Sequence, residues 1–136
     1  MFFKKGKPPA PSVQDEDRFI EWLIRYSDEL SDLRKPYRKN IDKFVDLSLK
    51  SINQELKEHD LHSGEALLSR AGKIAVFYQE NFAEKVDAYG GILNCPAQFQ
   101  AGAVMMVIKI SIMLYLAKHK YGAPIPEELL GMTKIE

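Results

Sequence analysis

The chain has 136 residues, 46% hydrophobic and 28% charged, so its composition resembles that of globular domains rather than of disordered chains. Nineteen basic and nineteen acidic residues cancel, which excludes a general electrostatic attraction to nucleic acid or anionic membranes. The one cysteine excludes an internal disulfide and a cysteine-rich zinc site, and the first residues lack the apolar core of a signal peptide. We therefore expect one soluble domain in a cytoplasmic setting, either free or peripheral to a membrane.

Residues 1–11 are predicted to form a flexible, basic and proline-rich arm, and residues 12–136 a single domain. The prolines of the arm favour extended geometry and cannot sustain a helix. Two aromatic side chains beside three lysines suit weak adsorption to an anionic membrane or insertion into a groove of a partner protein. The candidate residues for this contact are Phe2, Phe3, Lys4, Lys5 and Lys7.

The first two helices are predicted on either side of Pro36. Ser12 followed by Asp15 resembles a capping box, and apolar residues recur at steps of three and four from there to about Arg34. Because Pro36 disfavours helical geometry in the residue before it, we expect the first helix to end near Arg34 and a second to run towards His59. One kinked continuous helix is the alternative.

Two further helices follow the Ser63–Gly64 turn. The helical period of apolar residues continues to Tyr89, before two glycines that favour a helix end. The fourth helix is predicted over 97–121, before Gly122, and its apolar middle places it at the centre of the domain. A membrane-spanning role is disfavoured, because the apolar run is shorter than roughly 20 residues and contains Lys109.

The predicted fold class is all-α. The four helices suggest an up-down bundle with a largely buried, apolar fourth helix, and Glu127 to Leu130 add one short C-terminal helical turn. A part of the fourth helix left uncovered could form an oligomer interface, so a homo-oligomer is one of the expected states.

Three residues could carry metal or thiol chemistry. His59 and His62 lie three apart in an acidic stretch, but their spacing matches neither the metalloprotease nor the di-iron pattern. Cys95 precedes Pro96 and is expected at the N-cap of the fourth helix, where a thiol pKa can be lowered. Nothing in the sequence places a base beside Cys95, so we assign no catalytic residue. We also assign no metal site and no cofactor.

One dense basic cluster lies inside the domain. Cationic side chains contact phosphates, and aromatic side chains stack on bases. This basic corner is therefore a candidate site for an anionic partner. We consider nucleic acid a disfavoured partner, because no known nucleic-acid-reading module accompanies the cluster. The residues are Arg34, Lys35, Tyr37, Arg38 and Lys39.

The sequence thus favours a small, non-enzymatic helical protein-interaction module, such as an adaptor, a chaperone-like protein or a regulatory subunit with an unidentified protein partner. The inward helix positions are apolar, whereas an enzyme needs polar groups that converge in a concave site. Two alternatives remain. One is a metal-binding or enzymatic bundle that uses His59 and His62, and the other is a nucleic-acid-binding regulator that uses the basic corner from Arg34 to Lys39.

Overall fold

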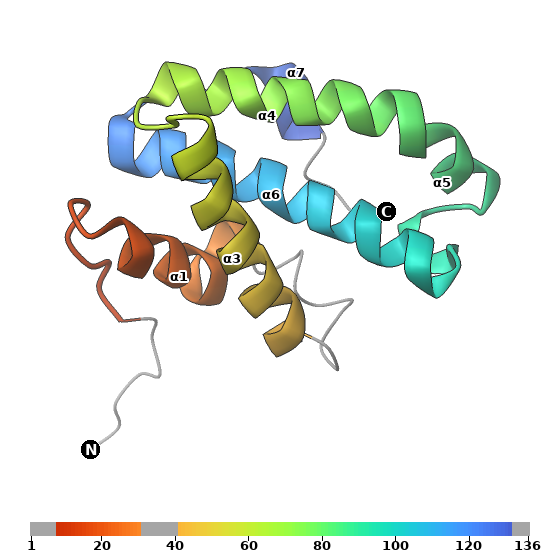
Figure 1. Cartoon of the computed structure of the whole chain (residues 1–136), viewed down its shortest axis with the longest axis horizontal. Coiled ribbons are helices and arrows are strands. Elements are labelled where there is room, and N and C mark those ends of the chain that lie inside the picture. Colours follow the sequence, from red (N-terminus) through yellow and green to blue (C-terminus); the bar gives the residue numbers. More distant parts are fainter. Residues whose placement is uncertain (1–7, 31–40, 132–136) are drawn as a thin grey trace.

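The computed structural model describes residues 8–30 and 41–131, and every regular element in these ranges is a helix, which confirms the all-α prediction (Figure 1). The long helices are α1 (Glu16–Tyr26), α3 (Ile41–Glu58), α4 (Gly64–Tyr78) and α6 (Ala97–Tyr121). The short ones are the π-helix η2 (Gln79–Ala83), α5 (Glu84–Ala88), the 3-10 helix η3 (Ile92–Asn94) and α7 (Glu127–Leu130).

Helix α1 begins at Glu16, after an N-cap at Asp15 rather than at the predicted Ser12. The side chain of Asp15 accepts a hydrogen bond from the backbone N–H of Arg18 at 3.3 Å, which caps the first turn. The helix ends at Tyr26, because Ser27 takes an extended backbone conformation and its carbonyl accepts the N–H of Leu30. Residues 28–30 are helical again, and the predicted end near Arg34 lies outside the described residues. The predicted break at Pro36 lies outside the described residues.

The turn between α3 and α4 follows the predicted Ser63–Gly64 signal. Asp60 adopts a left-handed conformation with φ of 52°, and Leu61 donates its backbone N–H to the carbonyl of Leu56. Ser63 then caps α4 by accepting a hydrogen bond from the backbone N–H of Ala66 at 3.0 Å. Local side-chain chemistry therefore sets both ends of this turn.

The predicted third helix is interrupted by a π-turn. Helix α4 gives way to the π-helix η2 before α5 completes the segment, and the chain leaves α5 through Gly90 and Gly91 with φ of 82° and 128°. The glycine stop is therefore confirmed, whereas the sequence pattern did not predict the π-turn. An extra residue within a helical turn rotates the side chains that follow the turn around the helix axis, relative to the side chains that precede it.

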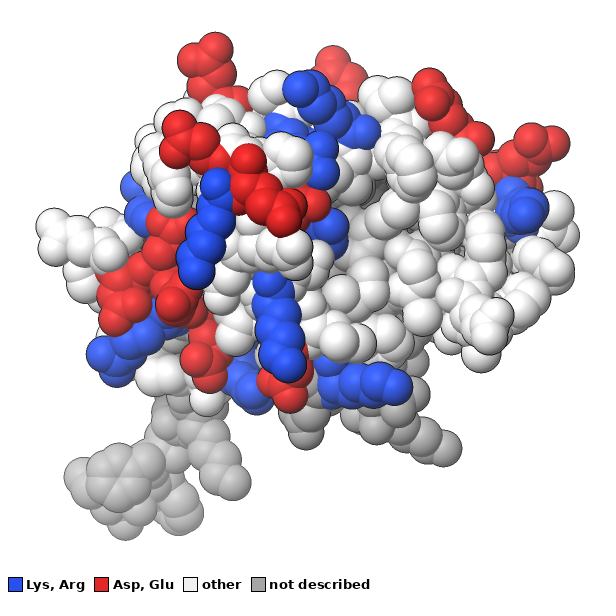
Figure 2. All heavy atoms as spheres, viewed as in Figure 1, with Lys and Arg blue, Asp and Glu red and all other residues white. Residues whose placement is uncertain are grey.

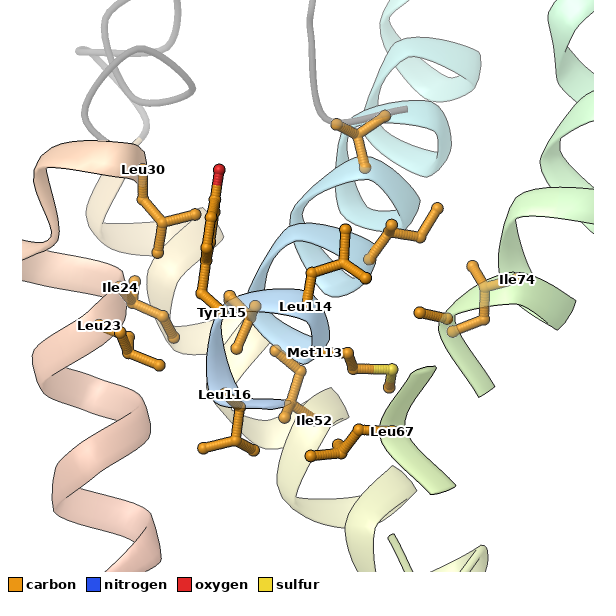
Figure 3. Close-up of a cluster of buried hydrophobic side chains, with 14 of the residues drawn as sticks. Leu23, Ile24, Leu30, Ile52, Leu67, Ile74, Met113, Leu114, Tyr115 and Leu116 are labelled. Atoms are coloured by element: carbon orange, nitrogen blue, oxygen red, sulfur yellow. The ribbon is translucent and has the colours of Figure 1, made fainter. Parts of the chain in front are cut away.

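Helix α6 lies at the centre of the fold, as predicted, and its bounds match the predicted range 97–121. Helices α4 and α6 lie side by side and run in opposite directions (Figure 1). Helices α1 and α3 also pack on α6, and the C-terminal end of α3 lies next to α4. Side chains from α1, α3 and α4 converge on the C-terminal half of α6 (Figure 3). All residues from Ile110 to Ala117 are buried, which accounts for the nearly continuous apolar sequence.

The N-terminal half of α6 is covered less completely. Ala103, Val104 and Val107 are buried, but Met106 and Ile108 are only partly buried. By length and composition α6 could cross a membrane, and half of its most apolar window is buried against the rest of the domain. Lys109 is a polar interruption of this helix, and its partners are described below.

Candidate protein-interaction surface

Lys109 belongs to a cluster of ionised side chains that joins three helices. Its ammonium donates to Glu55 of α3 at 3.1 Å, and the guanidinium of Arg70 on α4 donates to the same carboxylate at 2.7 and 3.1 Å. The side chain of Glu55 is only 12% exposed. The hydrogen bonds from Arg70, with a further one from Lys109, outweigh the opposing effect of burial and lower the pKa of Glu55 to about 2. The cluster therefore links α3, α4 and α6.

Three more contacts with carboxylates hold the C-terminal end of α6. Lys120 donates to Glu16, at the start of α1. Burial alone would lower the pKa of Lys120, but the carboxylate of Glu16 outweighs this effect and raises it. Lys118 and His119 both bind Glu29, at 3.0 and 2.8 Å. These contacts attach the N-terminal helical segment to α6.

The candidate metal-ligating histidines have different acidic neighbours. His59 lies 3.8 Å from Glu55, whereas His62 lies 3.8 Å from Glu16 and from Asp60. Among residues 8–30 and 41–131, no three histidine, cysteine, aspartate or glutamate side chains are grouped so that they could hold a metal ion. The two histidines therefore lie near different sets of carboxylates and do not face each other across a shared site.

Cys95 is not at the predicted N-cap position. The N-cap of α6 is Pro96, and Cys95 is the buried residue that ends η3. Its thiol donates to the carbonyl of Gly91 at 3.4 Å. The prediction was wrong by one residue, because Pro96 itself has the extended backbone of a cap and leaves Ala97 as the first helical residue.

The binding residues predicted from the sequence lie outside the described ranges. This holds for the arm residues Phe2, Phe3, Lys4, Lys5 and Lys7, and equally for the basic corner of Arg34, Lys35, Tyr37, Arg38 and Lys39. Pro8, which follows the arm lysines, is described: its carbonyl accepts a hydrogen bond from the indole N–H of Trp22 at 2.8 Å. The start of the described chain is thereby held against α1.

A surface of aromatic side chains lies at the opposite end of the molecule, where η2 meets the start of α6. The ring centroid of Phe82 lies 6.4 Å from that of Phe77 and 4.8 Å from that of Phe99. Phe77 is 50% exposed, and Phe82 and Phe99 are partly buried. We call these three residues the distal aromatic surface. Val76, Tyr89 and Leu93, all half-exposed, flank it along the chain.

The π-turn creates this surface. Phe77 and Phe82 are five residues apart, a separation that places side chains on different sides of an α-helix but close together across a π-turn. The ring of Phe82 also stacks on Tyr78, with an interplanar angle of 8°. On α6, Gly102 leaves room for it, since a Cβ there would lie 3.4 Å from the Phe82 ring. Phe82 is thereby fixed, and its neighbour Phe77 is left facing solvent.

The electrostatics of the surface are weakly acidic. Between Val76 and Phe99 the charged residues are Glu80, Glu84, Lys85 and Asp87, all exposed. Lys85 lies over the ring of Phe99, with its ammonium 5.6 Å from the ring centroid. The part of this face over the start of α6 is mostly uncharged, whereas charges crowd the other end (Figure 2).

Sequence reasoning missed this surface. Phe82 and Tyr89 were assigned to the inward face of one regular helix, yet Tyr89 is 50% exposed. The available signal was the five-residue spacing of Phe77 and Phe82, which does not fit an α-helical stripe.

The comparisons with known proteins do not identify the surface. No family model matches the chain, and no curated protein and no solved structure matches it.

Proposed function

We propose that this chain is a small, non-enzymatic helical protein-interaction module that binds a protein partner through the distal aromatic surface. An adaptor, a chaperone-like protein and a regulatory subunit all use a surface of this kind. In the same proposal the helical segments form one up-down bundle that presents the surface at its end. The observation that carries the proposal is the half-exposed Phe77, which is in contact with Phe82.

Exposed aromatic clusters are energetically favourable binding sites. Aromatic side chains bury large areas when a partner covers them and are enriched among residues that dominate binding energy. Here Phe82 is supported by Tyr78 and Phe99, so the surface is ordered before a partner arrives. Such preorganisation lowers the entropic cost of binding.

Charge favours a protein over an anionic membrane as the partner of this surface. Membrane-binding surfaces combine apolar side chains with lysine and arginine. Here three acidic residues and one lysine lie between Val76 and Phe99, and this balance opposes contact with anionic lipids. The same balance opposes contact with the phosphates of nucleic acid.

The test compares Phe77→Ser with a matched control. Leu47→Ser removes an apolar side chain that is 43% exposed on α3, away from the surface. We expect proteins captured from a native lysate by the wild-type chain to be captured equally by Leu47→Ser and to be lost with Phe77→Ser. A loss of affinity of at least about tenfold is expected, because buried aromatic anchors contribute strongly to binding.

Melting curves of both variants establish that each is folded. Phe77 lies at the surface, so the variant should melt close to the wild type. If folded Phe77→Ser captures the same proteins as the wild type, partner binding occurs elsewhere and the proposal is wrong.

A further inference from the structure

Two lysines lie beside the distal aromatic surface. The ring contacts of this surface run in series from Phe77 through Phe82 to Phe99. Lys85 lies at one end of the series, with its ammonium 5.6 Å from the ring centroid of Phe99. Lys73 lies at the other end, because it precedes Phe77 by four residues in α4, and side chains at this spacing are neighbours on a helix surface. The aromatic series therefore has a cation beside each of its ends.

Within the described part of the chain, neither lysine has a counter-charge. Both are exposed, and among residues 8–30 and 41–131 no carboxylate forms an ion pair with Lys73 or Lys85. Each lysine of α6, in contrast, is paired with a carboxylate. A cation that is not paired within its own chain remains available to a charged group of a partner.

The carboxylates near Lys85 in the sequence belong to other sides of its helix. Glu84 and Asp87 lie one and two positions from Lys85 in α5, and helical side chains at these spacings do not face each other. Among the described residues, the ammonium of Lys85 is the one charge that lies over a ring of this surface. The charge that a partner meets at the rings is therefore positive, although the whole segment contains more acids than bases.

We propose that the distal aromatic surface binds a protein segment in which acidic side chains flank an aromatic or other large apolar side chain. This inference rests on the proposed function and adds the chemistry of the partner. The apolar side chain of the segment covers Phe77, and its carboxylates pair with Lys73 and Lys85. Aromatic rings favour packing on other rings, and complementary charges fix the register of the bound segment.

The two parts of this recognition have different roles. Covering Phe77 removes apolar area from water and supplies most of the affinity. Ion pairs at the rim of an interface contribute more to orientation and to the choice of partner than to affinity. A segment that carries lysine in place of its acidic residues is rejected, because like charges then face each other.

A protein segment fits these charges better than an anionic membrane does. A membrane is a broad surface that also meets the exposed carboxylates of Glu80, Glu84 and Asp87. A single acidic side chain of a segment, in contrast, contacts only the lysine that faces it. The separation of the cations at the rings from the neighbouring acids therefore favours a narrow occupant.

The experiment selects peptides from a random display library on the full chain. We expect enrichment of peptides that combine an aromatic or large apolar residue with aspartate or glutamate, and loss of this enrichment with Phe77→Ser. The variant that carries both Lys73→Glu and Lys85→Glu should instead enrich peptides that contain lysine or arginine. Its matched control carries Lys50→Glu and Lys57→Glu, which reverse two charges at exposed positions of α3. The control should select the same peptides as the wild type.

A synthetic copy of the most enriched peptide then measures the effect of the two lysines. In fluorescence anisotropy it should bind the chain with Lys73→Glu and Lys85→Glu at least about tenfold more weakly than the wild type. The same peptide with lysine in place of its acidic residues should show the opposite order. Both differences should decrease as salt rises, because exposed charges are screened over about 10 Å at 0.1 M salt. Melting curves establish that each variant is folded.

Three results would overturn the inference. One is a set of enriched peptides that requires Phe77 but contains no excess of acidic residues. Another is an enriched peptide that binds the wild type and the chain with Lys73→Glu and Lys85→Glu equally well. The third is the absence of any peptide whose binding requires Phe77, because the occupant is then not a short segment.

Failure of this inference is separable from failure of the proposed function. If capture of proteins from a lysate depends on Phe77 but is unchanged by Lys73→Glu with Lys85→Glu, the proposed function stands and the chemistry of the partner is wrong. If neither capture nor peptide binding depends on Phe77, both proposals are wrong. Binding of phosphatidylserine vesicles that requires Phe77, without any peptide that does, would also contradict both, because the occupant would then be a membrane.

Discussion

At the residue scale, the contact of Glu55 with two cations decides how α3 is joined to the rest of the domain. Glu55 is partly buried and accepts hydrogen bonds from Arg70 and Lys109. A carboxylate in this position is stabilised in its ionised form, which is why its pKa falls to about 2. Removing it leaves two cations without their shared counter-charge.

We expect Glu55→Gln to lower the free energy of unfolding at neutral pH by about 3 kcal/mol, because the two cations then lie in a partly buried site without a carboxylate. Urea unfolding at pH 7 measures this change. Glu58→Gln is the matched control, since Glu58 is exposed on the same helix, hydrogen-bonds to Gln54, and affects Arg70 less than Glu55 does. The control should change stability by less than about 0.5 kcal/mol.

The same carboxylate should make stability depend on acid pH. The folded pKa of Glu55 lies below its usual value of 4.5, so its contribution is present above pH 4.5 and is lost as the pH falls towards about 2. The unfolding free energy of the wild type should therefore fall across this window, and Glu55→Gln should show a smaller fall. Equal pH dependence in the two proteins would show that the cluster does not stabilise the fold.

At the element scale, the glycines of α4 have different surroundings. A Cβ built on Gly64 would lie 2.7 Å from the Cβ of Ala123, so the N-terminus of α4 approaches the chain after α6 closely. A Cβ built on Gly72 meets no atom within 4 Å. Gly64 is therefore required by packing, whereas Gly72 only reduces the helix propensity of its element.

We expect Gly72→Ala to stabilise the protein by about 1 kcal/mol, because alanine has the higher helix propensity and the site has room. Gly64→Ala should destabilise it by about 1 to 3 kcal/mol, because Ala123 has no flexible side chain that could move away. Chemical denaturation of the two variants measures both changes. Stabilisation by both alanines would mean that the close approach at Ala123 is absent in solution.

The π-turn is the other feature decided at this scale. It separates the inward face of α4 from that of α5, so that Tyr78 and Val86 are buried while Phe77 and Tyr89 remain exposed. In a continuous α-helix these side chains would point in different directions relative to one another around the helix axis. The proposed binding surface therefore depends on one local irregularity in an otherwise regular segment.

At the scale of the whole molecule, α6 makes the fold cooperative. It contacts α1, α3 and α4, and its residues from Ile110 to Ala117 are buried. Each of the other long helices has more contacts with α6 than with any other long helix. Loss of α6 from the core would leave these helices with few apolar contacts, so the described helices should unfold together.

We expect thermal unfolding in a single transition. Far-ultraviolet circular dichroism reports all the helices, and the fluorescence of Trp22, the one tryptophan, reports α1. The two melting curves should coincide, because α1 is attached to α6 by core packing and by the contact of Glu16 with Lys120. A fluorescence transition at a lower temperature would mean that α1 detaches before the core unfolds.

The sequence by itself determined where most described helices begin and end. Ser63, Gly90 and Gly122 act on the backbone within a few residues of themselves, so they have their effect whatever the rest of the chain does. The central position of α6 could also be predicted, because a helix that is apolar on all sides is stable only when it is covered. These features depend on local chemistry and composition.

Only the tertiary structure decided which neighbours each residue has. Ile108 and Ile112 look equivalent in the apolar run, but Ile108 is partly exposed and Ile112 is fully buried. Lys109 is separated from Glu55 by 54 residues, so their ion pair exists only once α3 packs on α6. The distal aromatic surface likewise needs Phe99 to reach Phe82 across two elements. Contacts between distant residues depend on packing geometry, which periodicity along one helix does not encode.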